Sequence, residues 1–183
     1  MVKKFIKWLL LRFRFIPFIK YYVFEWELAG KAFNLLIINF FFQRILRINC
    51  KVSFSIHFTS KISYPSRIEL IKDKTTMNSF VLSGNCYFQA HSGIKIGKNF
   101  LFAPGIKIIS SNHDFKNRDL PSKTSPVIIG DNVWMGTSAI ILPGVEIGNN
   151  CIIGAGSVVT KSFKEDNLLI AGNPAKIIKL LKN

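Results

Sequence analysis

The stretch IGDNVWMGTSAIILPGVEIGNNCIIGAGSVVTKSFK, residues 129–164, repeats with a period of six residues. It divides into IGDNVW, MGTSAI, ILPGVE, IGNNCI, IGAGSV and VTKSFK, and the first residue of every unit is aliphatic or Met. Glycine follows that residue in four of the units, and the fifth position is mostly small. An internal period this short indicates a solenoid built from stacked, similar units.

The period also sets the cross-section of the solenoid. Six residues suit a short strand followed by a turn, and three units close one triangular coil, so that equivalent positions recur 18 residues apart, as 129 and 147 do. We therefore expect Ile129 to stack on Ile147, and Met135 on Ile153, inside a prism. Strict alternation over longer strands, which is typical of an antiparallel barrel, is not seen. The sequence predicts an all-β parallel β-helix over residues 51–163.

The two ends of this region are less regular. The register recurs in IGKNFL, FAPGIK and IISSNH from residue 96, whereas residues 52–95 fit it loosely and are expected to form irregular first coils. After Phe163 the pattern stops, and residues 164–183 are expected to close the open end of the solenoid. AGNPAKIIKLLKN suggests a short C-terminal helix, with Asn173 as its N-cap and Pro174 at its first position.

One segment interrupts the repeat. SSNHDFKNRDLPSKTSP, residues 110–126, is polar and irregular, although repeating units flank it on both sides. It contains the only Asn-His-Asp of the chain. We expect a loop at about residues 113–126 that protrudes from the β-helix.

The composition separates a front segment from the rest. The 183 residues carry a formal net charge of +15, and 49% of them are hydrophobic. Residues 1–51 hold ten of the 25 Lys and Arg residues, two of the ten Asp and Glu residues, and 13 of the 24 aromatic residues. The three cysteines, Cys50, Cys86 and Cys151, have no paired spacing, which is typical of reduced thiols in a reducing compartment.

Residues 1–50 form a basic, aromatic-rich amphipathic segment. Its charges interrupt the apolar stretch and no small-residue cleavage site follows, which argues against export. Its longest uncharged run, residues 32–43, is too short to span a bilayer. A helix ending near Pro17 would place basic and apolar side chains on opposite faces and favour peripheral contact with an anionic membrane. The alternative is a cap on the domain or on a neighbouring subunit. The aromatic residues lie among Leu and Ile, which disfavours nucleic-acid binding.

The hexapeptide units, together with PVIIGDNVWMG and IAGNPAKIIK, resemble the left-handed parallel β-helix acyltransferases. Within this hexapeptide-repeat family they are most similar to the maltose, galactoside and polysaccharide O-acetyltransferases. The resemblance is close over residues 94–181, weak over 52–93, and does not include the first 50 residues. It implies an acetyltransferase that uses acetyl-CoA, needs no metal, and assembles as a homotrimer with its active sites between neighbouring prisms.

The resemblance also assigns the chemistry of the interrupting segment. In this family a loop leaves the β-helix just after a histidine, and that histidine is the catalytic base; His113 occupies this place. A hydroxyl is a poor nucleophile until a base removes its proton, and imidazole, with a pKa of about 6.5, accepts a proton near neutral pH. We expect the acceptor hydroxyl to attack acetyl-CoA directly. An acyl-enzyme intermediate is disfavoured, because only Ser110 and Ser111 lie near His113 as possible nucleophiles. Asn112 and Asp114 either orient the ring or contact the acceptor, or they build the turn.

Further site residues follow from the resemblance. Arg118 either holds a sugar or is solvated, and Trp134 matches a tryptophan beside the active site of relatives, or caps a coil edge. Backbone groups of the Gly136–Ser138 turn and of Ala155 are expected along the pantetheine arm of CoA. The nucleotide end of CoA, which carries several phosphate charges, is expected near Thr160, Lys161 and Lys176.

The remaining histidines, His57 and His91, raise a metal alternative. The γ-class carbonic anhydrases, which share the hexapeptide fold, bind zinc through three histidines, and such a site here would need all three histidines of the chain. We expect no metal.

The acceptor follows from no motif of the sequence. The favoured hypothesis is a sugar hydroxyl of a lipid-linked cell-surface polysaccharide precursor, reached by an enzyme peripheral to the cytoplasmic face of the bacterial inner membrane. One alternative is a soluble acetyltransferase acting on a free sugar, nucleotide sugar or xenobiotic. A second alternative is a hexapeptide scaffold without activity.

Overall fold

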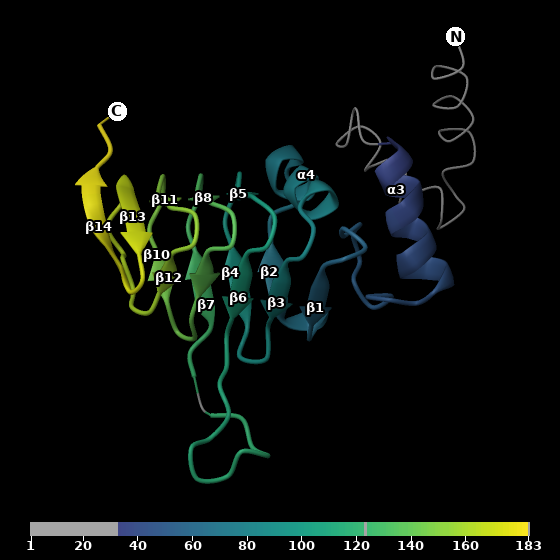
Figure 1. The fold of residues 1–183 in the computed structure, drawn as a ribbon, viewed down its shortest axis with the longest axis horizontal. Helices are drawn as coiled ribbons and strands as arrows, with labels where there is room; N and C mark the ends of the chain where they lie inside the picture. Colours follow the sequence, from purple (N-terminus) through teal and green to yellow (C-terminus); the bar gives the residue numbers. More distant parts are fainter. Residues whose placement is uncertain (1–32, 123, 183) are drawn as a thin grey trace.

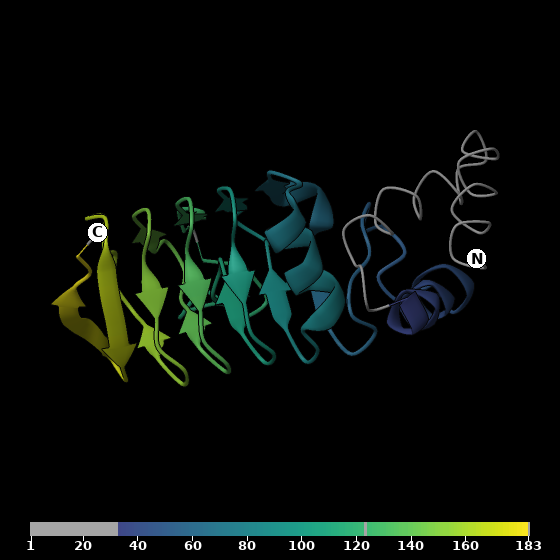
Figure 2. The same ribbon diagram turned by 90° about the horizontal axis from the view of Figure 1, so that it is seen from above.

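The computed structural model describes residues 33–122 and 124–182, most of which form a three-sided prism of stacked coils (Figure 1). The first side is a parallel sheet of β1 (Lys61–Ser63), β3 (Tyr87–Gln89), β6 (Lys107–Ile109), β9 (Ile140–Ile141) and β12 (Val158–Val159). The second side contains β2 (Ile68–Leu70), β4 (Ile94–Ile96), β7 (Val127–Ile129) and β10 (Glu146–Ile147). The third side contains β5 (Leu101–Phe102), β8 (Trp134–Met135), β11 (Ile152–Ile153), β13 (Leu168–Gly172) and β14 (Ala175–Leu180). Seen from above, successive coils stack side by side along one axis (Figure 2).

The register of the sheets confirms the period inferred from the sequence. Ile129 pairs with Ile147 between β7 and β10, and Met135 pairs with Ile153 between β8 and β11. All four side chains are at most 3% exposed. The first residue of each hexapeptide therefore points into the prism, and the core is a continuous column of such residues whose burial stabilises the fold.

Glycine at the second hexapeptide position is required by close packing between coils. A Cβ at Gly148 would lie 2.5 Å from the carbonyl oxygen of Glu165 and 2.7 Å from that of Lys164. Left-handed backbone occurs instead two positions after Gly148, at Asn150. Asparagine residues adopt this conformation, with φ between 55° and 62°, at Asn99, Asn132, Asn150 and Asn167. Glycine is favoured in a turn either because the backbone has a positive φ or because a side chain would not fit. At Gly148 the second reason applies.

The first coil departs from the repeat through a helix that the sequence interpretation missed. In place of a strand of the third sheet, this coil contains α4 (Lys74–Leu82). Asp73 caps this helix, because its carboxylate accepts hydrogen bonds from the Thr76 amide at 3.0 Å and the Thr76 hydroxyl at 2.7 Å. Phe80 of α4 packs against Phe88 and Phe102, with ring centroids 5.0 Å away in both cases.

A helical segment leads into this coil. It consists of α3 (Phe33–Phe40), which continues into the π-helical turn η1 (Phe41–Ile45), and the 3₁₀ turn η2 (Pro65–Arg67) follows β1. The predicted amphipathic helix that ends near Pro17 lies outside the described residues. Within the described residues, no helix has both the length and the apolar character needed to cross a membrane.

The predicted C-terminal helix is wrong. Residues from Leu168 form a β-hairpin in which β13 pairs in parallel with β11 and antiparallel with β14, and a cis Asn173–Pro174 bond lies in its turn. The end of the third sheet offers unpaired backbone groups, and a strand satisfies them where a helix cannot. Asn173 and Pro174 are therefore turn residues rather than a helix cap and first helical position, and the closing element is an edge of the sheet.

Candidate active site

The interrupting segment protrudes from one edge of the prism. It leaves at the end of β6 in the first sheet and returns at β7 in the second, so it lies on the edge between these two sheets (Figure 1). Residues that pair between neighbouring coils are 18 positions apart where no loop intervenes, as Met135 and Ile153 are. Where the loop lies between them they are 33 positions apart, as Phe102 and Met135 are. The prism continues in register after the loop, so the loop is an addition to a coil rather than a disruption of it.

The root of the loop is fixed by the side chain of Gln89, at the end of β3. Its Oε1 atom accepts hydrogen bonds from the amides of Ser110 at 3.1 Å and Ser111 at 3.0 Å, and its amide nitrogen donates to the Ser111 carbonyl at 3.1 Å. Thr124, where the loop returns toward β7, donates to the Ser110 carbonyl at 2.7 Å. Both serines are buried. No sequence pattern indicates this role for Gln89, because its partners are 21 and 22 residues away.

The loop itself is a short hairpin. His113 and Pro121 form an antiparallel bridge, and the Asp114 amide donates to the Leu120 carbonyl at 2.8 Å. The carboxylate of Asp114 accepts hydrogen bonds from the amides of Asn117 and Lys116, which lower its pKa from the usual value. These contacts make Asp114 a turn-forming residue, and its predicted contact with the ring or the acceptor stays a prediction.

The ring of His113 is oriented by the loop backbone. Its Nδ1 atom lies 2.6 Å from the carbonyl oxygen of Arg118, which can only accept a hydrogen bond. The neutral ring therefore carries its proton on Nδ1 and has its lone pair on Nε2. His113 is an exposed residue of the loop. Arg118 contributes this carbonyl, while its exposed side chain is available for a ligand, and Asn112 is exposed beside the ring.

Three of the residues predicted to contact CoA lie together on another edge. Gly136 and Ser138 belong to the turn from β8 to β9, and Ala155 to the turn from β11 to β12, so both turns lie between the third and first sheets. A Cβ at Gly136 would lie 2.6 Å from the Ala155 amide nitrogen, so only glycine fits there. Ser138 and Ala155 are exposed, which leaves their backbone accessible from this edge.

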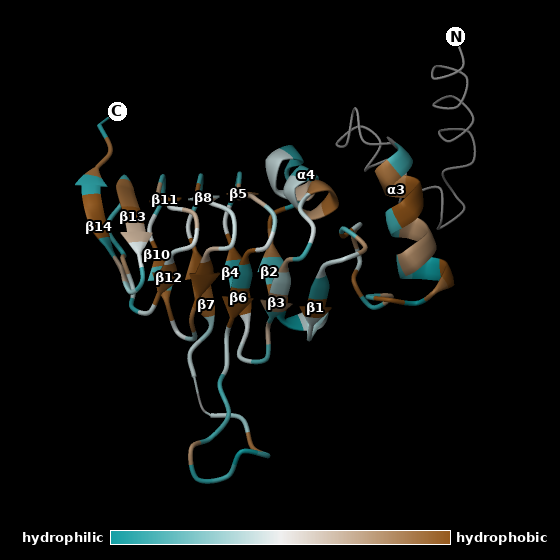
Figure 3. Cartoon of the chain, viewed as in Figure 1, coloured by the Kyte–Doolittle hydropathy of each residue, from teal (hydrophilic) through white to brown (hydrophobic). Residues whose placement is uncertain are grey.

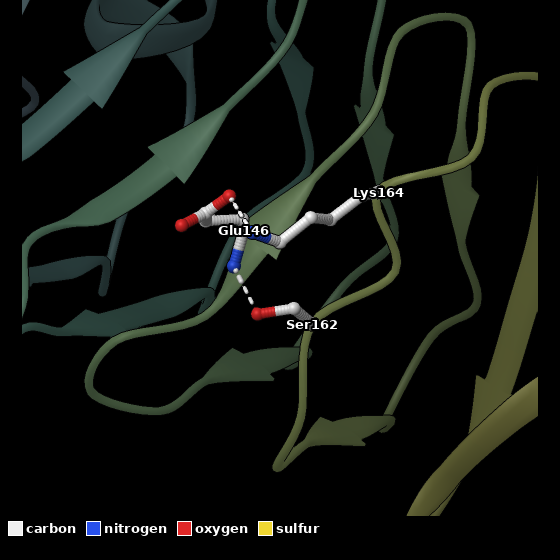
Figure 4. A network of polar contacts seen from close by, with 3 residues as sticks. All are labelled: Glu146, Ser162 and Lys164. Atoms are coloured by element: carbon white, nitrogen blue, oxygen red, sulfur yellow. Dashed lines mark hydrogen bonds and ion pairs between the residues drawn. The ribbon is translucent and has the colours of Figure 1, made fainter.

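The other predicted CoA contacts are spread over two places. Thr160 and Lys161 follow β12 on the edge that also carries the loop, and Lys176 is exposed on β14. Beyond Lys161 the chain is held against β10 by a network around Glu146 (Figure 4). Ser162 accepts a hydrogen bond from the Glu146 amide at 2.9 Å, and Lys164 forms an ion pair of 2.7 Å with the Glu146 carboxylate.

Trp134 lies apart from His113 within one chain. It is on β8, 48% exposed on the outer face of the third sheet, where it pairs with Leu101 and Ile152. The edge between the first and second sheets, which carries the loop, is opposite the third sheet in a three-sided prism. The chain thus brings together Asn112, His113, Asp114 and Arg118, but not His113 and Trp134.

The other two histidines have local contacts. His57 bonds Thr59 through Nδ1, and burial lowers its pKa. His91 packs edge-on against Tyr64, and its buried Nδ1 has no hydrogen-bond partner. Across residues 33–122 and 124–182, no three His, Cys, Asp or Glu side chains are grouped so as to hold a metal ion.

Comparison with known proteins identifies relatives of this fold. Residues 126–161 match the family model described as the hexapeptide repeat of succinyl-transferase. The chain is 32% identical over 171 residues to WbbJ of Escherichia coli K12, a protein named for O-acetyl transfer in lipopolysaccharide biosynthesis, and the match covers 80% of this chain and 84% of WbbJ. It is also 41% identical over 91 residues to the galactoside O-acetyltransferase of the same organism, covering 47% of this chain and 43% of that protein.

Solved structures show the same architecture. The maltose O-acetyltransferase from Clostridium difficile 630 superposes with a TM-score of 0.52 at 34% identity, covering 68% of this chain and 64% of that one. A galactoside acetyltransferase in complex with coenzyme A gives a TM-score of 0.61 at 24% identity over 85% of this chain and 82% of that one. These matches identify the prism as a left-handed parallel β-helix. The chain spans about half the length of several curated relatives that it matches.

Proposed function

The chain belongs to the family of hexapeptide-repeat acetyltransferases, and we propose that it transfers an acetyl group from acetyl-CoA to a hydroxyl group of a sugar. The observation that carries the proposal is the hydrogen bond between His113 Nδ1 and the Arg118 carbonyl. It fixes the tautomer in which Nε2 accepts a proton, on an exposed ring at the edge of a rigid prism. A positioned general base of this kind typically contributes about 10² to 10⁴ in rate.

In the proposed reaction His113 acts as base and then as acid. Nε2 removes the proton of the acceptor hydroxyl as its oxygen attacks the thioester carbonyl carbon. The tetrahedral intermediate collapses, the carbon–sulfur bond breaks, and the imidazolium returns the proton to the leaving CoA thiolate. Attack is direct, because the buried hydroxyl of Ser110 accepts a hydrogen bond from the Ser92 amide and that of Ser111 bonds the Asn112 carbonyl.

Acetyl-CoA is proposed to lie along the edges of the prism. Gly136, Ser138 and Ala155 would offer backbone groups to the pantetheine arm, because their two turns stack on one edge. The exposed Lys161 and Lys176 would contact phosphates, and Thr160 would contribute its hydroxyl.

A complete site is proposed to need a second copy of the chain. Trp134 and the turns at Gly136 and Ala155 lie on the third sheet or its edge, away from His113. In a homotrimer of prisms, the loop of one subunit would face the third sheet and the CoA-binding edge of the next. Phe115, at 94% exposure near the loop tip, is suited to such a contact.

The proposed acceptor is a lipid-linked precursor of a cell-surface polysaccharide, modified at the cytoplasmic face of the inner membrane. The similarity to WbbJ over most of both chains supports a glycan acceptor. The basic, aromatic first 50 residues support contact with an anionic membrane. A soluble acceptor, such as a free sugar or a nucleotide sugar, is the second candidate.

The test is transfer of labelled acetyl from acetyl-CoA into an extract of the source cells, followed by separation of lipid and aqueous fractions. The variant His113→Ala should lose transfer and keep acetyl-CoA binding, whereas Lys116→Ala, on the same loop, should behave as wild type. Label in the lipid fraction supports a lipid-linked acceptor, and label in the aqueous fraction supports a soluble one. Wild-type transfer by His113→Ala would refute the assigned base, and absence of any transfer by the wild-type protein would favour a scaffold.

A further inference from the structure

The helical segment before the first coil buries polar side chains against the domain and exposes apolar ones. The side chains of Asn39 and Gln43 are 0% and 2% exposed, and both face the domain. Asn39 donates to the Val81 carbonyl at 3.2 Å and accepts from the Phe58 amide at 3.0 Å, while Gln43 donates to the Phe54 carbonyl at 2.8 Å. Buried polar groups are stable when bonded in this way. Polar anchors therefore attach this segment to the domain, together with the buried Leu36 and the contact of Phe42 with Phe58.

The opposite side of the segment is apolar and faces outward. Six large hydrophobic side chains within residues 37–48 are between 41% and 60% exposed, and we name them the apolar ridge: Ile37, Ile38, Phe41, Ile45, Leu46 and Ile48. Much of α3 and part of the segment that follows it are coloured as hydrophobic, with hydrophilic bands between (Figure 3). A contiguous exposed patch of this kind typically marks a surface that contacts a protein or a membrane.

Positive charge adjoins the last part of the apolar ridge. Residues 33–68 contain five Lys and Arg residues and no Asp or Glu. A cavity of about 530 Å³ opens beside Ile48, the last residue of the ridge, and its lining includes Arg47, Lys51 and Lys61 but no acidic residue. We name it the cationic cavity. Lys51 also lines a neighbouring cavity of about 700 Å³ together with Lys72, again without an acidic residue.

Charge decides between the possible occupants of this surface. A second copy would bring the same cations face to face, which is unfavourable. Residues 1–32 carry seven Lys and Arg residues and two Glu, so they would not neutralise the cationic cavity either. A bilayer with anionic headgroups offers acyl chains to the ridge and phosphates to the cavity.

We propose that the apolar ridge and the cationic cavity form a docking surface for a membrane that contains anionic phospholipid. The ridge enters the boundary between headgroups and acyl chains, and a headgroup phosphate occupies the cationic cavity. The inference deepens the proposed function, on which it rests for its biological purpose, by naming the part of the chain that brings the active site to a lipid-linked acceptor.

The apolar part of the proposal is tested by flotation of the full chain with vesicles of phosphatidylglycerol and phosphatidylcholine. The double variant Phe41→Ser, Ile45→Ser should bind at least about tenfold more weakly than wild type. A matched control, Ile178→Ser with Leu180→Ser on β14, changes side chains that are 58% and 66% exposed at the other end of the prism, and should bind as wild type. Equal binding by wild type and the ridge variant, or equal loss in the control, overturns the proposal.

The charged part is tested with the same vesicles. The double variant Arg47→Glu, Lys51→Glu should bind about tenfold more weakly, and wild type should bind pure phosphatidylcholine poorly. Lys179→Glu with Lys182→Glu makes the same change in net charge at the C-terminal end and should have little effect. If both pairs reduce binding equally, net charge alone drives it and the cationic cavity has no special role. A change in oligomer size of the ridge variant without vesicles would assign the ridge to a second copy instead.

A separate measurement distinguishes failure of docking from failure of the proposed function. His113→Ala should float with vesicles as wild type does, while losing acetyl transfer. The ridge variant Phe41→Ser, Ile45→Ser should transfer acetyl normally in a detergent-solubilised extract and lose transfer on intact membranes. Vesicle binding by a wild-type protein that transfers no acetyl would refute the proposed function and leave the docking surface intact.

Discussion

Gln89 is predicted to control activity although it is not placed in contact with a substrate. Its side chain joins the end of β3 to the first residues of the loop that carries His113. In the variant Gln89→Leu the side chain keeps a similar volume but loses all three of these hydrogen bonds. The buried amide and carbonyl of Ser111 then lose their partner on Gln89, and the loop root is no longer fixed.

The expected magnitude follows from these three bonds. Each contributes a net free energy of about 0.5–1.5 kcal/mol, so the ordered position of the loop loses about 3 kcal/mol. About 1.4 kcal/mol corresponds to tenfold in rate, so kcat/KM should fall by about 100-fold if the ordered loop is needed in the transition state. Gln89→Glu keeps the two accepted bonds and should show a smaller loss.

The assay is acetyl transfer together with acetyl-CoA binding and thermal unfolding. Gln89→Leu should bind acetyl-CoA as wild type, because the predicted contacts with CoA lie outside the loop. The matched control is Asn149→Ala on another edge, where the side chain also makes three hydrogen bonds, one from the Asp131 amide and two to the Asp166 carboxylate. It should lower the melting temperature and keep transfer. Wild-type transfer by Gln89→Leu would refute the argument.

Two further predictions concern stability. Burial alone would raise the pKa of Asp73, but hydrogen bonds, led by the one from the Thr76 amide, outweigh burial and hold the pKa below its usual value. The carboxylate therefore stabilises the fold above about pH 4, and this stabilisation is lost as the pH falls through the lowered pKa. Asp73→Ala should therefore lower the free energy of unfolding by about 1 kcal/mol at pH 7, and urea titrations should show this difference shrinking in acid; a difference independent of pH would contradict the carboxylate role. Gly148→Ala should cost about 1–3 kcal/mol in the same titrations because its Cβ meets backbone oxygens of the next coil, and a neutral result would show that the coils can separate.

The regular part of the fold was predictable because the period acts on every residue of the prism. A strand pairing displaced by one residue would move Ile129 and Met135 from the core to the surface, so the hydrophobic pattern alone specifies the register. The protruding loop was predictable as the break in that pattern. The proposed role of His113 rests on the resemblance, and the structure adds the orientation of its ring.

The irregular parts depended on contacts that no local pattern records. Asp73 and Thr76 have the spacing of a helix N-cap and its partner, but the loose repeat around them does not indicate a helix. AKIIKLLKN suits a helix locally, yet pairing with the free edge of β13 makes it a strand. The role of Gln89 was not predictable, because side chains in a solenoid meet partners one coil away rather than neighbours in sequence.

The architecture of the prism explains why functional groups must come from the protruding loop and from the edges between the sheets. Most of its strands are two or three residues long and their inward side chains fill the core, so the outward side chains and the edges between the sheets are what remains for function. The loop supplies the proposed base at one edge, and the turns of Gly136 and Ala155 supply exposed backbone at another. These edges are held apart by the rigid core, so no bending of one chain brings His113 to Trp134. If both act in one reaction, as proposed, they must belong to different copies, and catalysis then depends on assembly.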